Sequence, residues 1–293
     1  MTIRLKHEHG KLEEIELFQL QHHLALPHLK KYLQSKGAKQ CKSIKKISVD
    51  HSNLDDKDYH ALHDILKLSS KVNEISFYAN HIDTDQVTYL FESLPSKKLN
   101  KIKLVDNWIG EKIPSDFFSF LQKKKLKVLD LSLNWLRDTG VQHLLEAIEA
   151  NTELNELALS CNDFGLGGMK ALHHFVLKHP TLKILDISYN NLDEKCAKEI
   201  STMITESKSL THLNLRSNKI GDAGAELIAH ALKSNKDLKY VDLSDNRISE
   251  TGLSQLVREA VAHDKLAGLI LKHNHLLLPP TLKSNQSDLH VFY

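Results

Sequence analysis

The sequence predicts an α/β fold in which about nine strand–helix repeats of 27–28 residues stack in one row. Two observations lead to this prediction: a leucine pattern returns every 28 residues, and each copy is followed by apolar residues four positions apart. A third observation, that the chain of 293 residues has three cysteines, excludes a fold held together by disulfides. One strand–helix repeat cannot bury its own apolar side, so neighbouring repeats have to cover it.

The strand of each repeat follows the pattern L-x-x-L-x-L-x-x-N-x-L, whose alternating leucines share one face of a strand. We count positions from the first leucine. Six copies in strict register begin at Leu126, Leu154, Leu182, Leu210, Leu238 and Leu266. Three weaker copies begin at Leu99, Val72 and Ile44, and the last of these has Ser52 in place of the asparagine. The asparagine at position nine is expected to bind main-chain groups where the chain leaves the strand, so stacked copies predict an asparagine ladder.

The second half of each repeat is predicted to be a helix. Four repeats share a glycine at one position, and a fifth has Cys196 in the same slot; the glycines are Gly140, Gly168, Gly224 and Gly252. Apolar residues follow this slot after four and eight residues, as Ile228 and Leu232 follow Gly224. Spacing of this kind places one side of a helix against the core.

The two ends depart from the repeat. Residues 1–43 are predicted to be an N-terminal cap, with a hairpin from Thr2 to Phe18 that turns at His9-Gly10-Lys11 and a helix from Leu20 to Gln34 that Pro27 interrupts. Residues 44–276 form the repeat region, and residues 277–293 a C-terminal cap or tail. Two alternatives stay open for the apolar residues Leu289 to Tyr293: they fold back over the last repeat, or they form a free recognition tail.

The full-helix repeat, written as Asn218-Lys219-Ile220-Gly221-Asp222-Ala223-Gly224-Ala225 in one copy, resembles the ribonuclease-inhibitor-like class of leucine-rich repeats. The resemblance covers residues 44 to 276. It implies a horseshoe-shaped leucine-rich-repeat solenoid, with parallel strands on the concave face and helices on the convex face, that binds other proteins. The chain neither alternates long and short repeats nor shares the inhibitor's high cysteine content, so inhibition of a ribonuclease is not implied.

Composition narrows the expected partners. The chain has 39 Lys and Arg against 37 Asp and Glu, and this near balance argues against a dedicated nucleic-acid binder. No stretch approaches the roughly 18 apolar residues that span a bilayer, and the start lacks the apolar core of a secretory signal. Three cysteines fit a reducing compartment. We therefore expect a cytoplasmic monomer that binds protein, with no nucleic-acid or membrane partner.

No motif in the sequence indicates catalysis. Asp163-Phe164-Gly165 matches a magnesium-binding tripeptide of protein kinases, but Phe164 occupies the last apolar position of its repeat. The close histidine pairs lie on different repeats, whereas a zinc site needs three or four converging ligands. Cys161 and Cys196 have no adjacent base in the pattern. We expect no catalytic residue, no metal and no cofactor.

Exposed positions of the pattern suggest a binding surface. Position ten holds Trp108 and Trp135, the two tryptophans of the chain, in successive repeats. Because equal positions of a solenoid stack, we expect the two indoles to be neighbours on one rim and to anchor a partner. The alternative is that each indole packs across its own loop and protects the ladder. The other candidate partner-binding residues, on the concave face and rim of the more basic C-terminal repeats, are Tyr189, His212, Arg216, Tyr240, Arg247 and Lys272.

The sequence thus predicts a non-catalytic protein–protein interaction module that binds its partner through the concave face and adjoining rim. One alternative is a GTPase-activating protein of the leucine-rich-repeat type, because known activators of that type have repeats of this class; nucleic-acid binding is a second. The Lys-, Asn- and His-rich style resembles effectors of intracellular bacteria, which implies a virulence protein delivered into a host-cell cytosol to act on a host protein.

Overall fold

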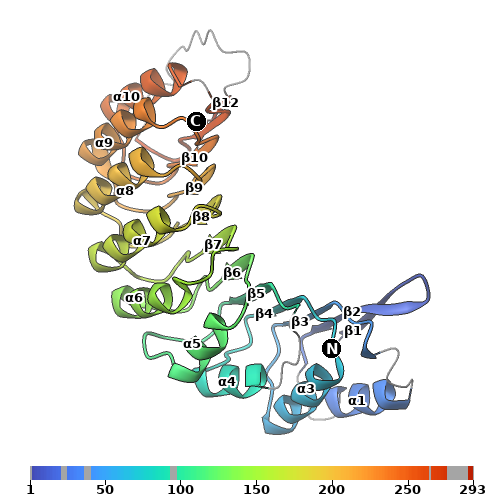
Figure 1. Cartoon of the computed structure of the whole chain (residues 1–293). Coiled ribbons are helices and arrows are strands. Elements are labelled where there is room, and N and C mark those ends of the chain that lie inside the picture. The colour runs from blue at the N-terminus through green and yellow to red at the C-terminus, as the bar shows by residue number, and fades with distance from the viewer. Residues whose placement is uncertain are drawn as a thin grey trace. The chain divides into compact units, whose positions relative to one another are not determined.

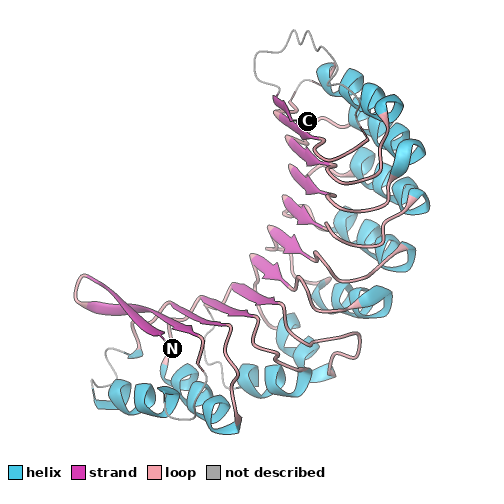
Figure 2. Ribbon diagram, turned by 180° about the vertical axis from the view of Figure 1, so that it is seen from behind, coloured by secondary structure: helices cyan, strands magenta, loops and turns pink. Residues whose placement is uncertain are grey.

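The computed structural model describes residues 2–20, 25–35, 41–92, 98–263, 265–275 and 290–292. The chain divides into two compact parts, an N-terminal lobe, Met1–Asn134, and a C-terminal lobe, Trp135–Tyr293. In each lobe the strands form a sheet and the helices pack along one side of it (Figures 1 and 2).

The N-terminal lobe begins with an antiparallel hairpin of β1 (Thr2–Glu8) and β2 (Lys11–Phe18). From β2 onward neighbouring strands are parallel and follow chain order. The remaining elements are α1 (Ala25–Ser35), β3 (Lys46–Asp50), α3 (Asp56–Leu68), β4 (Glu74–Tyr78), α4 (Thr84–Glu92), β5 (Lys101–Val105), α5 (Ser115–Gln122) and β6 (Val128–Asp130).

The C-terminal lobe repeats the strand–helix alternation, and its strands also lie in chain order. Its elements are α6 (Arg137–Ile148), β7 (Glu156–Ala158), α7 (Leu166–Lys178), β8 (Ile184–Asp186), α8 (Glu194–Glu206), β9 (His212–Asn214), α9 (Gly221–Ser234), β10 (Tyr240–Asp242), α10 (Glu250–Val261), β11 (Gly268–Ile270) and β12 (His290–Phe292). Among the described residues, β3 to β11 are the strands of the nine predicted repeats, so the predicted fold class is confirmed.

The core lies between the strands and the helices. The apolar residues of the pattern are buried throughout, as Leu210, Leu213 and Leu215 of β9's repeat show. Phe164, in the kinase-like tripeptide, is fully buried in the last apolar position of its repeat, as expected. The leucine periodicity therefore marks the core.

The predicted asparagine ladder is present, and Asn218 shows its geometry. Its side-chain Nδ2 donates to the carbonyls of Ile187 at 3.1 Å and Leu215 at 2.9 Å. Its Oδ1 accepts from the main-chain N–H groups of Asn190 at 3.1 Å and Leu192 at 3.2 Å. One buried amide thus satisfies main-chain groups of its own repeat and of the preceding one, which is why position nine requires asparagine.

Ser52 occupies the ladder position of the first repeat. It is buried, and its N–H donates to Oδ1 of Asn80 at 3.0 Å. Its Oγ accepts from the N–H of Leu20 at 3.1 Å. The shorter side chain thus links the ladder to the segment that follows the hairpin.

Position eight has a left-handed backbone in all nine repeats, with φ between 48° and 60°. The residues there are His51, Ala79, Asp106, Leu133, Cys161, Tyr189, Ser217, Asp245 and His273. This conformation costs a non-glycine residue about 1 kcal/mol or more. It turns the N–H toward the next repeat: that of Tyr189 donates to the carbonyl of Arg216 at 2.8 Å, and that of Asp245 to Lys272 at 2.9 Å. The bond between repeats offsets the strain.

The glycine slot of the helices is a place of close packing. A Cβ on Gly224 would lie 2.7 Å from Cγ2 of Ile220 and 2.9 Å from Cβ of Ala197, so a larger side chain requires the neighbouring repeat to shift. Cys196 fills the same slot in its own repeat and is buried. Burial raises the pKa of the Cys196 thiol to about 12, which keeps it protonated and unreactive at neutral pH.

The ends bear out part of what the sequence suggested. The hairpin from Thr2 to Phe18 is present, and the helix after it is described from Ala25. At the other end β12 pairs in parallel with β11, so His290–Phe292 fold back onto the last repeat rather than forming a free tail. Leu276 and residues 277–289 lie outside the described residues. The division into cap, repeat region and C-terminal cap remains a prediction.

Candidate functional site

Strand residues at positions three, five and seven point away from the helices, and we call the surface they form the open face. In the C-terminal lobe the sheet register places Ile184, His212, Tyr240 and Gly268 side by side at position three of four successive repeats. Ile184 is 38% exposed and Tyr240 is 44% exposed. The register therefore produces a row of apolar and aromatic groups across β8, β9, β10 and β11.

Tyr240 is held in this row on both sides. The ring of His212 stacks on it, with ring centroids 4.8 Å apart and planes inclined by 20°. On the other side, a Cβ on Gly268 would lie 2.6 Å from Cδ1 of Tyr240, so the ring rests in the space that glycine leaves. The Tyr240 ring is thus fixed in place although almost half of the residue is exposed.

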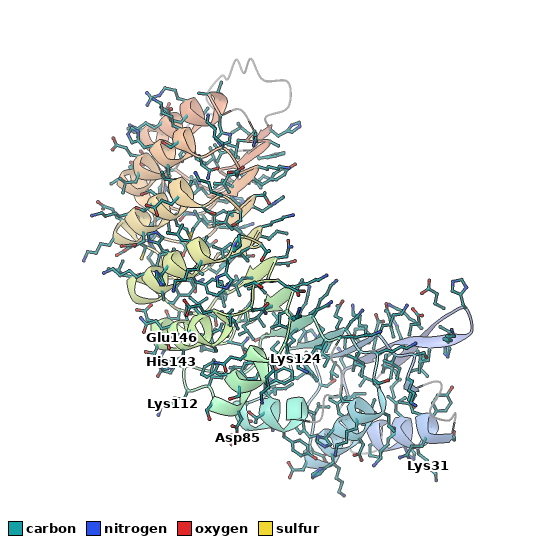
Figure 3. The ribbon with its side chains drawn as sticks, in the orientation of Figure 1. Lys31, Asp85, Lys112, Lys124, His143 and Glu146 are labelled. Carbon is teal, nitrogen blue, oxygen red and sulfur yellow. The ribbon has the colours of Figure 1, made fainter. Side chains whose placement is uncertain are left out.

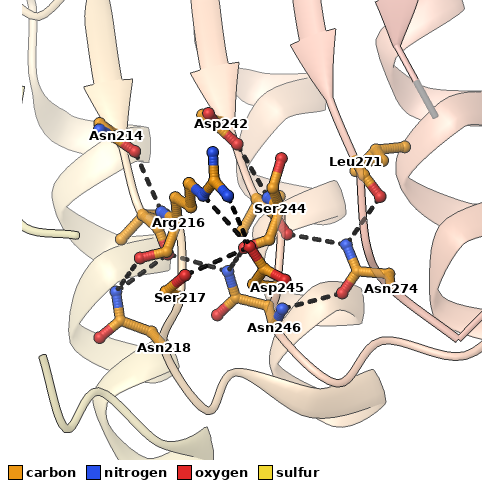
Figure 4. Close-up of polar contacts among 12 residues, drawn as sticks. Asn214, Arg216, Ser217, Asn218, Asp242, Ser244, Asp245, Asn246, Leu271 and Asn274 are labelled. Carbon is orange, nitrogen blue, oxygen red and sulfur yellow. Dashed lines mark hydrogen bonds and ion pairs between the residues drawn. The ribbon is translucent and has the colours of Figure 1, made fainter. Parts of the chain in front are cut away.

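Arg216, at position seven of β9's repeat, contacts both neighbouring repeats, and Figure 4 shows its ion pair with Asp245. Its Nε and Nη2 each lie 3.1 Å from Oδ2 of Asp245 in the next repeat. Its guanidinium lies 5.9 Å from the ring centroid of Tyr189 in the preceding repeat. Tyr189 is 47% exposed and stands at a left-handed position. The cation–π contact and the ion pair fix the arginine while leaving it on the surface.

The carboxylates between these groups are occupied by local bonds. Oδ1 of Asp186 accepts from the N–H and Oγ of Ser188, and its Oδ2 accepts from Nδ2 of Asn214 at 3.0 Å. Oδ1 of Asp242 accepts from the N–H of Ser244 at 2.8 Å. These hydrogen bonds come from uncharged groups, so they orient the carboxylates at the ends of the strands and leave their negative charge in place.

The last strand extends the same surface. Phe292 of β12 pairs with Ile270 of β11 and is 45% exposed. The Nζ of Lys272 lies 5.9 Å from the centroid of its ring. We call the following set the aromatic–basic patch: Ile184, Tyr189, His212, Arg216, Tyr240, Lys272 and Phe292.

After Trp135, the rim at position ten of the C-terminal lobe is polar. Lys219 donates to Oδ1 of Asn191 at 2.7 Å, and Asn191 in turn bonds Asp163, so equal positions of successive repeats contact each other. Arg247 is exposed at this position with φ of 59°. Trp135 begins the lobe at the same position, 62% exposed and with φ of 56°.

Trp108 lies in the N-terminal lobe and is also 62% exposed. It contacts His81, the position-ten residue of the preceding repeat, with ring centroids 4.6 Å apart. Stacking of equal positions therefore holds inside each lobe. Because Trp108 and Trp135 belong to different lobes, their contact with each other stays a prediction.

The open face of the N-terminal lobe combines ion pairs with one exposed aromatic contact, between His51 and Tyr78, whose ring centroids lie 4.9 Å apart. Glu74 lies between two lysines, 3.2 Å from Lys46 and 3.8 Å from Lys101. On the hairpin, Lys6 contacts Glu14 at 3.1 Å and Glu16 at 2.5 Å. Opposite charges on neighbouring strands thus neutralise one another within the face.

The helix side of both lobes carries charged side chains that point outward, among them Lys31, Asp85, His143 and Glu146 (Figure 3). A groove of about 560 Å³ runs between α6 and α7. Its lining mixes opposite charges, and Lys178 binds Glu149 across it. This pairing gives the groove no distinct chemistry, so the aromatic–basic patch is the stronger candidate.

All eight residues that the sequence proposed for partner binding can now be located. Five of them, Tyr189, His212, Arg216, Tyr240 and Lys272, come together in the patch, while Arg247 lies on the rim and the two tryptophans in separate lobes. Ile184, Gly268 and Phe292 were missed as site residues. Ile184 and Gly268 stand in the same strand column as Tyr240, and that column was the signal that could have found them.

Among the described residues, no group of three metal-binding side chains converges. No helix within the described ranges is long and apolar enough to cross a membrane.

Comparison with known proteins agrees with this architecture. The family model described as leucine-rich repeat matches five segments, residues 122–145, 150–172, 178–201, 206–229 and 234–257. These segments follow the strand–helix repeats of the structure. The fold is a leucine-rich-repeat solenoid. The matching family describes a repeat typical of protein-interaction modules and indicates no catalytic activity.

Three solved structures are similar to this chain at low sequence identity. A Bacteroides fragilis protein from structural genomics is 17% identical, with a TM-score of 0.51 over 82% of this chain and 71% of its own. Leiomodin-1 actin-binding site 2 is 22% identical (TM-score 0.42; 46% of this chain, 78% of that one). The tropomodulin C-terminal domain of Caenorhabditis elegans is 14% identical (TM-score 0.41; 48% and 87%). No curated protein matches the sequence.

Proposed function

We propose that this leucine-rich-repeat protein is a non-catalytic interaction module that binds a partner protein through the aromatic–basic patch and the adjoining rim. One observation carries the proposal: Tyr240 is fixed between His212 and Gly268 while 44% of it stays exposed. A ring held in this way is not part of the buried core. It offers a partner a rigid aromatic surface.

Preorganisation makes such a surface effective. Arg216 is already oriented by Asp245 and Tyr189, so a partner that contacts it loses less side-chain entropy than with a free arginine. Exposed tyrosine and arginine are also the residue types that dominate binding energy at protein interfaces. Lys272 and Arg247 add positive charge beside the aromatic groups, while Arg216 is paired with Asp245. A partner with carboxylates placed opposite Lys272 and Arg247 fits this arrangement.

A capture experiment tests the proposal. The immobilised protein is incubated with cell lysate, bound proteins are identified, and the affinity of the recovered partner is measured for Tyr189→Ala with Tyr240→Ala. The expected loss is about tenfold or more, because two exposed aromatic anchors disappear.

The matched control removes two equally exposed apolar side chains from the helix side, by Leu177→Ala with Leu227→Ala; these leucines are 39% and 37% exposed. The control should retain wild-type affinity. Equal losses for the two double variants, or no loss for the tyrosines, would contradict a patch-specific contact.

The finer identity is also a proposal: a repeat of the ribonuclease-inhibitor-like class in a bacterial effector that binds a host protein in the host cytosol. Its support is the repeat style and the Lys-, Asn- and His-rich sequence. Capture from animal-cell and bacterial lysates in parallel tests it, and a partner found in bacterial lysate alone would contradict it.

A GTPase-activating protein remains the alternative, supported by the repeat class. Arg216, on the open face, is bound to Asp245 and is not free to reach a nucleotide without breaking that pair. A GTP hydrolysis assay with a panel of small GTPases distinguishes the two, since an interaction module leaves the hydrolysis rates unchanged.

A further inference from the structure

The outer edge of β11 binds the short strand β12 through main-chain hydrogen bonds, as the edge of a sheet binds an extended peptide. The N–H of His290 donates to the carbonyl of Ala267 at 2.8 Å, and the N–H of Leu271 donates to the carbonyl of Phe292 at 2.7 Å. The three residues of β12 pair with Gly268, Leu269 and Ile270 in parallel register. An exposed strand edge is a template for such pairing, and main-chain bonds provide affinity whatever the origin of the added strand.

The side chains of β11 and of Lys272 determine which residues a strand paired with β11 can carry. Because strand side chains alternate, His290 and Phe292 share the open face and Val291 faces the opposite side, level with the buried Leu269. Phe292 lies level with Ile270, and the ammonium group of Lys272 lies 5.9 Å from its ring centroid. Gly268, level with His290, adds no side chain to the edge. The pairing therefore fits an aliphatic residue followed by an aromatic one.

The occupant differs from the strands of the interior repeats. Phe292 and His290 remain exposed and Val291 is half-buried, so β12 depends on main-chain bonds and on two partly covered side chains. A strand this short can stay bound because it belongs to the same chain, which gives it an effective concentration in the millimolar range. A segment of another protein with the same pattern would meet the same groups on β11.

We infer that the outer edge of β11 is a strand-docking site for extended peptide segments with an aliphatic–aromatic pattern, occupied in the free protein by the chain's own β12. The site shares Lys272 and Phe292 with the aromatic–basic patch, but it acts through main-chain pairing. Tyr189 and Tyr240 take no part in it, so failure of the site and failure of the proposed function are distinguishable.

The probe is a fluorescent peptide with the sequence of residues 286–293, and its binding is measured by fluorescence anisotropy. Two full-length variants release the edge: Phe292→Ala, which removes one half-exposed ring, and the replacement of His290, Val291 and Phe292 by glycine. We expect the triple variant to bind the peptide at least about tenfold more tightly than the wild type, whose edge is filled, and Phe292→Ala to fall between them.

Two peptide controls separate strand pairing from adhesion. Methylation of the main-chain nitrogen of His290 in the peptide keeps every side chain but removes the donor to Ala267, and should weaken binding at least about tenfold. Replacement of the peptide's Phe292 by alanine should also weaken it. A protein variant with Tyr189→Ala and Tyr240→Ala in addition to the triple change should bind as the triple variant does, because the patch is not needed.

The inference is overturned if a cooperatively melting triple variant fails to bind the peptide, or if the N-methylated peptide binds equally well. Phe292→Ala provides the same decision should the triple variant not fold, because Phe292 is 45% exposed and its loss leaves the core of the last repeat intact. In that case, affinity equal to that of the wild type refutes the site.

Discussion

The two lobes have the same strand–helix repeat, but their open faces carry different side chains at the same positions. At position three the N-terminal lobe places Glu74 between Lys46 and Lys101, and the carboxylate pairs with both ammonium groups. At the same position the C-terminal lobe stacks His212 on Tyr240. A partner that approaches the ionic face must displace existing ion pairs, whereas the aromatic rings are already exposed and oriented. We therefore propose that the C-terminal lobe contributes the larger share of the binding specificity.

The largest expected effect tests whether the asparagine ladder stabilises both lobes to the same extent. Asn107→Ala in one lobe and Asn218→Ala in the other each remove a buried amide that bonds main-chain groups of two repeats. Loss of several buried hydrogen bonds should lower the free energy of unfolding by about 3 kcal/mol in both variants. Urea denaturation followed by circular dichroism measures this.

The matched control for the ladder is Asn191→Ala, which removes an exposed amide that bonds only the rim side chains of Lys219 and Asp163 and no main-chain group. Its effect should stay within about 0.5 kcal/mol. If the two ladder variants differ strongly in free energy of unfolding, the ladder does not stabilise the two lobes equally. A difference in binding between the open faces would then also reflect the stability of each lobe.

The next effect decides how much each lobe contributes to binding. Trp108→Ala and Trp135→Ala remove equally exposed indoles from the N-terminal and C-terminal lobes. Their combination should cost about 2 kcal/mol or more of partner affinity with an unchanged melting curve. Because Trp108 already packs on His81, we expect the larger single loss for Trp135. Unchanged affinity of the double variant would refute the tryptophans as anchors.

A smaller effect tests the aromatic stack. Gly268→Ala places a Cβ about 2.6 Å from Cδ1 of Tyr240 and must move the ring away from its position on the sheet. We expect a loss of about 1–2 kcal/mol in stability and altered ring-current shifts of His212 protons in the NMR spectrum. Gly10→Ala, in the hairpin turn at φ of 74°, is the control: the positive φ strains an alanine and lowers stability, but its Cβ meets no ring, so the His212 signals should stay unchanged. Unperturbed His212 signals in Gly268→Ala would show that glycine does not position Tyr240.

The fold could be predicted from the sequence because every repeat has to bury the same face and bond the same main-chain groups. Leucines at fixed spacing mark the buried face, and an asparagine in each repeat meets the same unpaired main-chain groups each time. Ser52 shows the limit of that reasoning: it looked like a defect in the first repeat, yet its hydroxyl accepts from Leu20 and its N–H continues the ladder. A pattern of residue types does not reveal a substitute that bonds in another way.

The candidate site was only partly predictable for a different reason. Columns of equal positions placed Tyr240 beside His212, because register follows from the repeat. Contacts between unequal positions, such as Arg216 with Asp245 at positions seven and eight, depend on side-chain rotamers and on the left-handed turn after each strand. Phe292 enters the patch from outside the repeat region, so no column contained it.

A modest effect is expected on the ionic side of the comparison. Glu74→Gln removes the charge shared by Lys46 and Lys101, and partly exposed pairs of this kind contribute well under about 1 kcal/mol. The loss should shrink in about 1 M salt, where such pairs are screened. Partner affinity should not fall, and a clear decrease would mean that the N-terminal face takes part in binding.

The smallest effect is a pH dependence confined to the aromatic side. Burial, and secondarily the nearby charge of Lys239, lowers the pKa of His212 below its ordinary value of about 6.5. The folded protein thus binds this proton less tightly than the unfolded chain does. The stabilising contribution is complete above pH 6.5 and is lost as the pH falls through the lowered pKa.

Melting temperatures at about pH 7.5 and about pH 5 therefore should differ more in the wild type than in His212→Phe, which keeps a ring on Tyr240 but cannot be protonated. Lys239→Met should lie between them, because it removes the second cause of the shift and leaves burial unchanged. The other histidines are common to all three proteins, so the difference between variants isolates His212. Equal losses in the wild type and His212→Phe would show that the stack does not respond to pH, and the contrast between the lobes would then rest on shape and exposure rather than on titration.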